Sequence, residues 1–359
     1  MSDATTKQMI DMYMETAPVP MFLSGLFRTP GENFFTSEKV EVDVERDEEE
    51  IAIVVHDLTA GWRENQSTKY ENKEFTPPVF KEEGTVSAFE MIKRRPGVDP
   101  FKQPDFLAHA SEDAFKIFRK LQSKIARSVE LMASQVLQTG TLTLTDVNAV
   151  ALYTLDFGML SDHKMDVTEW KTDGTGGAPL VDLALAAQRI RRNGKVNPNK
   201  LLFGDSAFQR FIVNADVQKR IVKDGLGIGQ LAPASRGEGA TFQGWIWIGH
   251  YRFEMWLYDG YYKAPSTGTL TPYIGTDNVI MLSDKSRLDL KYGAIPLFDN
   301  TRRALPVLPQ RMNSVEKGIG FTVNSWVTPD GEHLKVQAGT RPITIPTAID
   351  TFVTLDVGA

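Results

Sequence analysis

The sequence contains no cysteine, which excludes disulfides, thiolate metal sites and cysteine nucleophiles and is compatible with a reducing cytosol. It has no run of 18 apolar residues, so it predicts no membrane-spanning helix. The N-terminal stretch lacks the basic start and apolar core of a secretory signal. A basic excess is also missing, because the formal net charge is −6 and surfaces that bind nucleic acid are usually basic. We therefore expect a protein that is used in the cytosol, or released from it by lysis.

The composition is that of an ordinary globular protein. The 359 residues are 42% hydrophobic and 24% charged, which allows a sizeable core and predicts about two domains. Valines alternate with acidic residues over 40–45, the period of a half-buried strand, and an acidic turn at 47–50 leads to a second predicted strand at 51–55. The polar, weakly patterned residues 58–76 predict a long projecting loop.

A long helix is predicted from about Ser111 to Gln138. At about 1.5 Å per residue it would be roughly 40 Å long. Ser111 is a suitable N-cap, and Gly140 is a suitable stop. One apolar stripe runs along this helix, with its members three or four residues apart: Phe115, Phe118, Leu121, Ile125, Val129, Met132 and Val136.

Residues 160–285 are predicted to form an α/β insertion. It contains a helix that ends at Gly194, then a strand and a helix in "KLLFGDSAFQRFIV", then two aromatic strands in "WIWIGHYRFEMWLYDGYYKA". Residues 286–359 predict short strands separated by prolines. The aromatic side chains could stack single-stranded bases, but only Arg252 and Lys263 are basic there, so we favour packing within the sheet. These aromatic side chains are Trp245, Trp247, Tyr251, Phe253 and Trp256.

Two short stretches are compatible with hydrolytic chemistry. "FGDS", ending at Ser206, is similar to the nucleophile block of GDS-type esterases, and "DGEH", ending at His333, has the Asp-x-x-His spacing of their acid and base. Ser206 lies in mid-chain, however, and the helper glycine and asparagine blocks are missing. Asp205 and Ser206 also fit the N-cap of a helix. We therefore favour a structural role for Ser206.

Other candidate ligand sites are weaker. "DGTGGAP" at 173–179 and "DGLGIGQ" at 224–230 lack the Walker lysine and the Rossmann spacing, so both predict flexible loops. The five histidines are not paired at helical spacing, and "SDHKMD" around His163 offers too few ligands for a metal. We expect surface histidines, no catalytic residues, no metal and no cofactor.

An apolar knot near the N-terminus is a candidate contact between subunits. "MFLSGLF" places Phe22, Leu23, Leu26 and Phe27 at helical spacing, and prolines on both sides prevent a longer helix. Such a segment cannot form a core alone, so it must dock on the body or on a neighbouring copy. We expect the second.

A basic corner at Lys93, Arg94 and Arg95 is a second contact candidate. Pro96-Gly97 stiffens it, and arginine can grip carboxylates with two parallel hydrogen bonds. The acidic block 47–50 of a neighbouring copy, with Glu48 and Glu49, is a suitable partner, and so are the carboxylates of that copy's insertion at 160–285. Packaged DNA and a solvated turn remain the alternatives.

Four stretches, in order along the chain, resemble a known family. They are "FLSGLFRTPGENFFTSEKVEV", "FTPPVFKEEGTVSAFEMIKRRPGVDPF", "VELMASQVLQTGTLTL" and "DTFVTLDVGA". Together they resemble the major capsid protein of lambda-type tailed phages. The resemblance implies an α+β, Hong Kong 97-type fold with an N-terminal arm at 1–35 and an extended loop with its base at 36–100. It also implies a peripheral domain at 101–159 and 286–359 that contains the spine helix, and an axial domain at 160–285.

The resemblance implies a major capsid protein that assembles as hexamers and pentamers into an icosahedral phage head around double-stranded DNA. It implies a virion protein, assembled in the host cytoplasm, that is not an enzyme. The expected partners are further copies, a scaffolding protein, the portal and a decoration protein, with weak, non-specific contacts to the packaged DNA and none to a membrane. The alternatives are a GDS-type esterase that uses Ser206 and His333, and a non-viral shell protein of the same fold.

Overall fold

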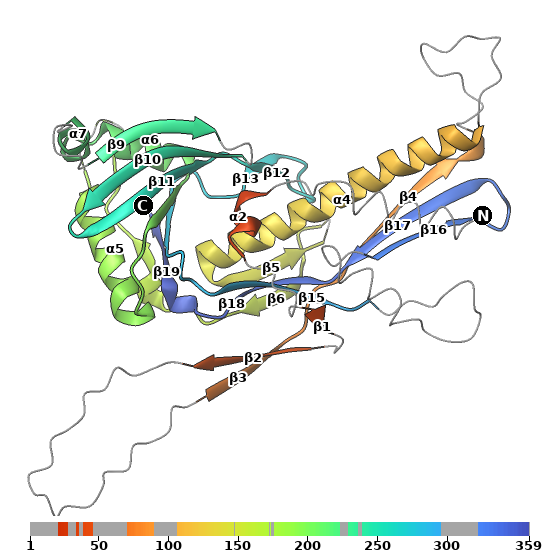
Figure 1. Ribbon diagram of the computed structural model, residues 1–359, viewed down its shortest axis with the longest axis horizontal. Helices are drawn as coiled ribbons and strands as arrows, with labels where there is room; N and C mark the ends of the chain where they lie inside the picture. The colour runs from red at the N-terminus through yellow and green to blue at the C-terminus, as the bar shows by residue number, and fades with distance from the viewer. Residues whose placement is uncertain are drawn as a thin grey trace, which may run out of the picture.

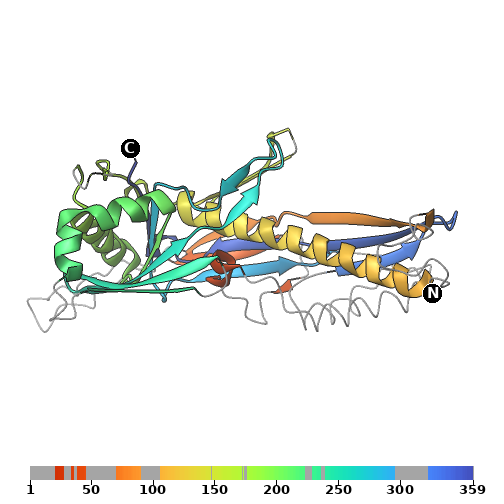
Figure 2. The same cartoon turned by 90° about the horizontal axis from the view of Figure 1, so that it is seen from above.

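One long helix, α4 (Phe106–Thr139), organises the molecule and lies along its long axis (Figure 1). The computed structural model describes residues 21–27, 34–35, 39–45, 70–89, 106–146, 148–171, 173, 176–222, 229–235, 239–295 and 322–358. Seen from above, α4 runs through the elongated half, and the green helices gather at the other end (Figure 2).

The predicted long helix is confirmed, and it begins five residues earlier than expected. Its stripe packs as predicted, since Phe118, Ile125 and Met132 are almost fully buried. Each such side chain stabilises the fold by roughly 1.5–3 kcal/mol. Gly140 ends the helix with a φ of +65°, a conformation that glycine adopts without steric cost.

The first half of α4 packs on a three-stranded antiparallel sheet. The sheet has the order β16 (Thr322–Val327), β17 (His333–Thr340) and β4 (Phe80–Ser87). Buried apolar side chains of α4, β4, β16 and β17 join the two layers: Val86, Ala114, Phe118, Val323 and Val336. Strands far apart in sequence therefore hold this half of the helix.

The second half of α4 packs on a seven-stranded mixed sheet, in the order β7-β19-β14-β8-β11-β10-β9. Helices α5 (Pro179–Gly194), α6 (Asp205–Val213) and α7 (Ala215–Val222) pack on its other face. The seven strands are β7 (Lys164–Asp166), β8 (Lys200–Phe203), β9 (Gly229–Ser235), β10 (Ala240–Ile248), β11 (Tyr251–Tyr258), β14 (Asn278–Leu282) and β19 (Phe352–Asp356). The predicted insertion helix, the strand–helix unit and the two aromatic strands are all present.

Strand β19 joins the sheet of the insertion, and the expected division of the chain into domains stays a prediction. That division assigns residues 286–359 to the peripheral part, while β19 pairs with β14 and β7. Strand pairing over such a separation depends on tertiary packing, which the local pattern does not specify.

The remaining elements are short. Strand β1 (Phe34–Phe35) joins β15 (Leu288–Gly293) and β18 (Pro342–Pro346). The two-stranded sheets are β2 (Val40–Glu45) with β3 (Tyr70–Phe75), β5 (Thr141–Thr145) with β6 (Ala151–Asp156), and β12 (Tyr261–Lys263) with β13 (Leu270–Pro272). Single turns of helix are α2 (Phe22–Gly25), η1 (Ser161–His163) and η3 (Ile349–Thr351).

Two strands near the N-terminus were expected to pair with each other. The first is confirmed as β2, but its partner is β3, which lies inside the segment predicted to be a loop at 58–76. The predicted partner at 51–55 lies outside the described residues. β3 alternates polar and apolar residues weakly, which is why its sequence did not indicate a strand.

Candidate functional site

Three polar residues form a line along the second, buried half of α4. We call Glu130, Ser134 and Gln138 the polar ridge. They are four residues apart and therefore share one helix face. Glu130 and Ser134 are buried, and each of the three makes hydrogen bonds to a distant segment of the chain. The ridge thus fixes how the rest of the subunit sits on its central helix.

Glu130 holds the segment that contains α2. Its Oε1 accepts a hydrogen bond from the backbone N–H of Leu23 at 2.7 Å, and its Oε2 accepts one from Ser24 at 2.8 Å. The Tyr258 hydroxyl also donates to Oε1, at 2.7 Å. Burial and the charge of Glu130 raise the pKa of Tyr258, so this hydroxyl stays protonated and keeps its role as donor.

Gln138 and Ser134 hold the segment that leads into β14. Gln138 Oε1 accepts from the N–H of Gly275 at 2.9 Å and from Asn278 Nδ2 at 2.8 Å, while its own Nε2 donates to the Tyr273 carbonyl at 2.8 Å. The Ser134 hydroxyl donates to the same carbonyl. The end of α4 is thereby joined to the seven-stranded sheet by directional contacts.

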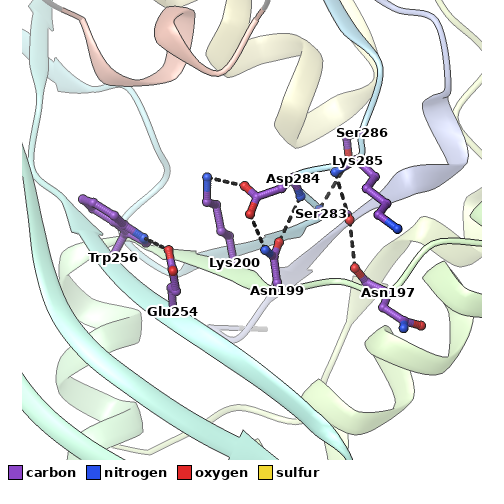
Figure 3. A network of polar contacts seen from close by, with 9 residues as sticks. All are labelled: Asn197, Asn199, Lys200, Glu254, Trp256, Ser283, Asp284, Lys285 and Ser286. Atoms are coloured by element: carbon purple, nitrogen blue, oxygen red, sulfur yellow. Dashed lines mark hydrogen bonds and ion pairs between the residues drawn. The ribbon is translucent and has the colours of Figure 1, made fainter.

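A second polar network lies where β8 and β14 meet (Figure 3). Asn199 Oδ1 accepts from the backbone N–H of Asp284 at 2.9 Å, and the Asp284 carboxylate also contacts the Asn199 amide and Lys200. The Ser283 hydroxyl donates to the Asn197 carbonyl at 2.8 Å. These contacts are satisfied within the subunit, so the network stabilises a turn and presents no reactive group.

The apolar knot packs on its own subunit. Leu23 and Phe27 are buried in the core beside α4, and Phe22 and Leu26 are partly buried against it. The ring of Phe22 lies 5.1 Å from that of Trp256. This intrachain packing occupies Leu23 and Phe27, so any contact between subunits at this knot depends on the exposed parts of Phe22 and Leu26 and stays a prediction.

The basic corner and its expected acidic partners are outside the part of the chain that the structure describes. Lys93, Arg94, Arg95, Glu48 and Glu49 lie outside the described residues, as do residues 1–20 of the expected arm. The proposed contact between them therefore stays a prediction.

The two hydrolytic candidates are not brought together. Ser206 lies in α6, while His333 begins β17, and these elements lie at opposite ends of the molecule (Figure 1). Asp330 accepts hydrogen bonds within its own turn instead. The Thr328 hydroxyl and the Glu332 N–H stabilise its charged form and lower its pKa. The triad-like geometry that the esterase needs is absent from these residues.

The N-cap interpretation of Asp205 and Ser206 is wrong by one or two positions. Gly204 is the N-cap of α6, and Asp205 is already the first helical residue. Gly204 is required there because an added Cβ would lie 2.3 Å from the Gly275 carbonyl oxygen. The structural role expected for this stretch is therefore a close crossing of two backbone segments.

The expectation of surface histidines is wrong for His163. Its side chain is fully buried, with Nδ1 2.7 Å from the Phe352 carbonyl and Nε2 3.0 Å from Asn193 Nδ2. A neutral ring that donates from Nδ1 and accepts at Nε2 satisfies both contacts. In the part of the chain that the structure describes, no three His, Asp or Glu side chains are grouped as a metal site. None of the described helices is long and apolar enough to cross a membrane.

The aromatic strands pack mainly inside, as expected. Phe253, Tyr251 and Trp256 are buried. Trp247 is 38% exposed, and the guanidinium of Arg252 lies 4.8 Å above the ring of Trp245. One cation paired in this way is too little for a track that binds single strands.

Sequence reasoning missed the polar ridge. The available signal was weak: Glu130, Ser134 and Gln138 recur at a spacing of four residues, but other polar residues such as Arg127 and Gln135 lie on the same half of the helix. A charged residue on a buried helix face must find hydrogen-bond partners elsewhere in the fold.

Comparisons with known proteins agree with this architecture. The family model described as phage major capsid protein E matches residues 5–357. No curated protein matches the chain in sequence.

Solved structures show the same fold at low sequence identity. A protein described as a capsid protein of a prophage, from E.coli CFT073, is 15% identical, with 99% of each chain covered and a TM-score of 0.66. A phage-related protein from Bordetella bronchiseptica RB50 is 10% identical, with 98% of this chain and 97% of that chain covered and a TM-score of 0.54.

Proposed function

The chain belongs to the phage major capsid protein E family, and we propose that its copies assemble as hexamers and pentamers into an icosahedral head around double-stranded DNA. The family match carries this conclusion, because it covers nearly the whole chain. The expected resemblance to phage major capsid proteins and the Hong Kong 97-type fold are confirmed. Family and fold are structural rather than enzymatic.

Exposed apolar side chains on two hairpins support contacts between copies. Leu152 on β6 is 74% exposed, and Leu270 on β13 is 75% exposed. Val150 and Tyr261, on the same hairpins, are also at least half exposed. Exposed side chains of this size are suitable for burial between copies of the chain. Neighbouring copies are the natural partners in a shell.

A role as a shell subunit also implies other protein partners. A shell of this family needs an entry point for DNA and control of its size, so we propose a portal, a scaffolding protein and an optional decoration protein as partners. The net charge of −6 supports weak, non-specific contact with the packaged DNA. Assembly would take place in the host cytoplasm, and the protein would end in the virion.

Electron microscopy of the purified protein tests the proposal. We expect rings or closed hollow shells of uniform curvature, formed alone or with a co-expressed scaffolding protein. Analytical ultracentrifugation should show species far larger than the 40.1 kDa chain. A chain that remains a folded monomer under all these conditions would contradict shell assembly.

A further inference from the structure

We call the segment Met21–Phe27 the strap. It is fixed to α4 by a two-point contact with the carboxylate of Glu130. Both carboxylate oxygens are used: one accepts from Leu23 and the other from Ser24, at 2.7 and 2.8 Å. These two N–H groups belong to the first turn of α2, where backbone donors have no partner within the helix. Glu130, more than 100 residues away in sequence, therefore supplies the acceptors that α2 lacks.

The electrostatics of Glu130 make this contact stronger than an ordinary surface contact. The residue is 0% exposed, and among the described side chains no lysine or arginine forms an ion pair with it. A buried carboxylate without a cation is costly unless several donors surround it. Among the residues that the structure describes, the Tyr258 hydroxyl is the one donor to Glu130 that would remain if the strap left. Docking of the strap and burial of the Glu130 charge are therefore coupled.

Apolar packing places the strap but does not fix its register. Phe22 stacks on the ring of Tyr258 with centroids 5.8 Å apart, and Leu23 and Phe27 are buried. Such contacts have no preferred direction. The paired hydrogen bonds to one carboxylate do have one, and a four-residue helix is too short to persist without them.

We propose that Glu130 is a latch residue that commits the strap to the body of its own subunit, so that the strap is either docked and helical or released. Because Leu23 and Ser24 are adjacent and bind the same carboxylate, the two hydrogen bonds form and break together. This proposal concerns the single subunit and does not rest on shell assembly. Glu130 acts here as a positioning residue for the strap.

Hydrogen exchange on the full chain, followed by mass spectrometry, tests the latch. In Glu130→Gln, an isosteric change that replaces one acceptor oxygen with a donor, amide exchange over residues 21–27 should become about tenfold faster or more. Exchange over β14 should change much less. The matched control is Glu112→Gln, on the exposed part of the same helix, which should leave both segments unchanged. Unchanged exchange over 21–27 in Glu130→Gln, or an equal rise over β14, would overturn the proposal.

A pair of changes on the strap keeps the test valid if Glu130→Gln does not fold. Ser24→Pro removes the N–H that donates to Oε2, and it also disfavours the helical conformation of the preceding Leu23, so it opposes both the hydrogen bond and the helix that the latch requires. Ser24→Ala keeps that N–H and removes only the hydroxyl. Exchange over residues 21–27 should rise about tenfold in the proline variant and stay near wild type in the alanine variant. Equal rates in the two variants would contradict a latch that acts through the backbone.

Discussion

Gln138 and Asn278 are 140 residues apart, yet the Gln138 side-chain oxygen lies 2.8 Å from the Asn278 amide nitrogen. The same oxygen accepts from the Gly275 N–H, so one side chain joins the end of α4 both to the first residue of β14 and to the turn that precedes it. We expect Gln138→Ala to lower the free energy of unfolding by about 1–3 kcal/mol, because it leaves partly buried donors without their acceptor. Gln188→Ala, on an exposed position of α5, is the control and should change little. Thermal unfolding of both variants measures the difference.

Two glycines with the same backbone conformation should respond differently to alanine. Gly140 and Gly249 have φ values of +65° and +63°, but an added Cβ would lie 2.4 Å from Met159 Cβ at the first and near nothing at the second. The left-handed conformation alone costs roughly 1–2 kcal/mol, and crowding adds a similar amount. We predict that Gly140→Ala costs about 2–4 kcal/mol and Gly249→Ala about half of that. Equal losses in chemical denaturation would show that Met159 moves aside freely.

Ser206 is predicted to have no catalytic role. It lies far from His333, and Gly204 rather than Ser206 caps α6. Ser206→Ala should therefore cost about 1 kcal/mol at most. Hydrolysis of short-chain ester substrates should be the same for the variant and the parent, at the background rate. Ester turnover by the parent chain that disappears in Ser206→Ala would contradict this prediction.

The basic corner is predicted to act between copies. Arg94→Glu combined with Arg95→Glu should give a folded subunit that closes few shells, because each lost ion pair is repeated in every copy even though one exposed pair contributes only about 0–1 kcal/mol. Charge reversal at Glu48 and Glu49 to lysine should partly restore closure. Sedimentation and micrographs provide the measurement.

Normal shells from the double arginine variant would rule out the contact between copies. Normal empty shells that retain less DNA would instead indicate that the corner binds phosphate.

The local sequence pattern predicted where helices and strands lie better than it predicted which strands pair with each other. The stripe from Phe115 to Val136 was sufficient to locate α4, and alternation over 40–45 located β2, because both signals depend only on nearby residues. The partner of β2 and the sheet that β19 joins depend on contacts across large separations. No local period encodes those contacts.

The polar contacts were harder to predict than the apolar ones. The polar sequence around His163, with Asp162 and Asp166 close by, indicated a surface position. In the structure its two ring nitrogens instead contact the Phe352 carbonyl and the Asn193 side chain in the interior. Glu130 likewise gave no local sign of its partners at Leu23 and Tyr258. A buried polar group is specified by where its donors and acceptors lie in space, and that follows only once the fold is known.

The position of β19 near the end of the sequence determines when the seven-stranded sheet can be completed during synthesis. Among the described strands, β19 is the one that joins β7 to β14, and its residues 352–356 are synthesised nearly 190 residues after β7. Until then, the inner edges of β7 and β14 have no partner from β19, and contacts of such long range form slowly. The seven-stranded sheet of a nascent chain therefore stays incomplete until residues 352–356 have been made, so its final tertiary structure depends on one of the last strands in the sequence.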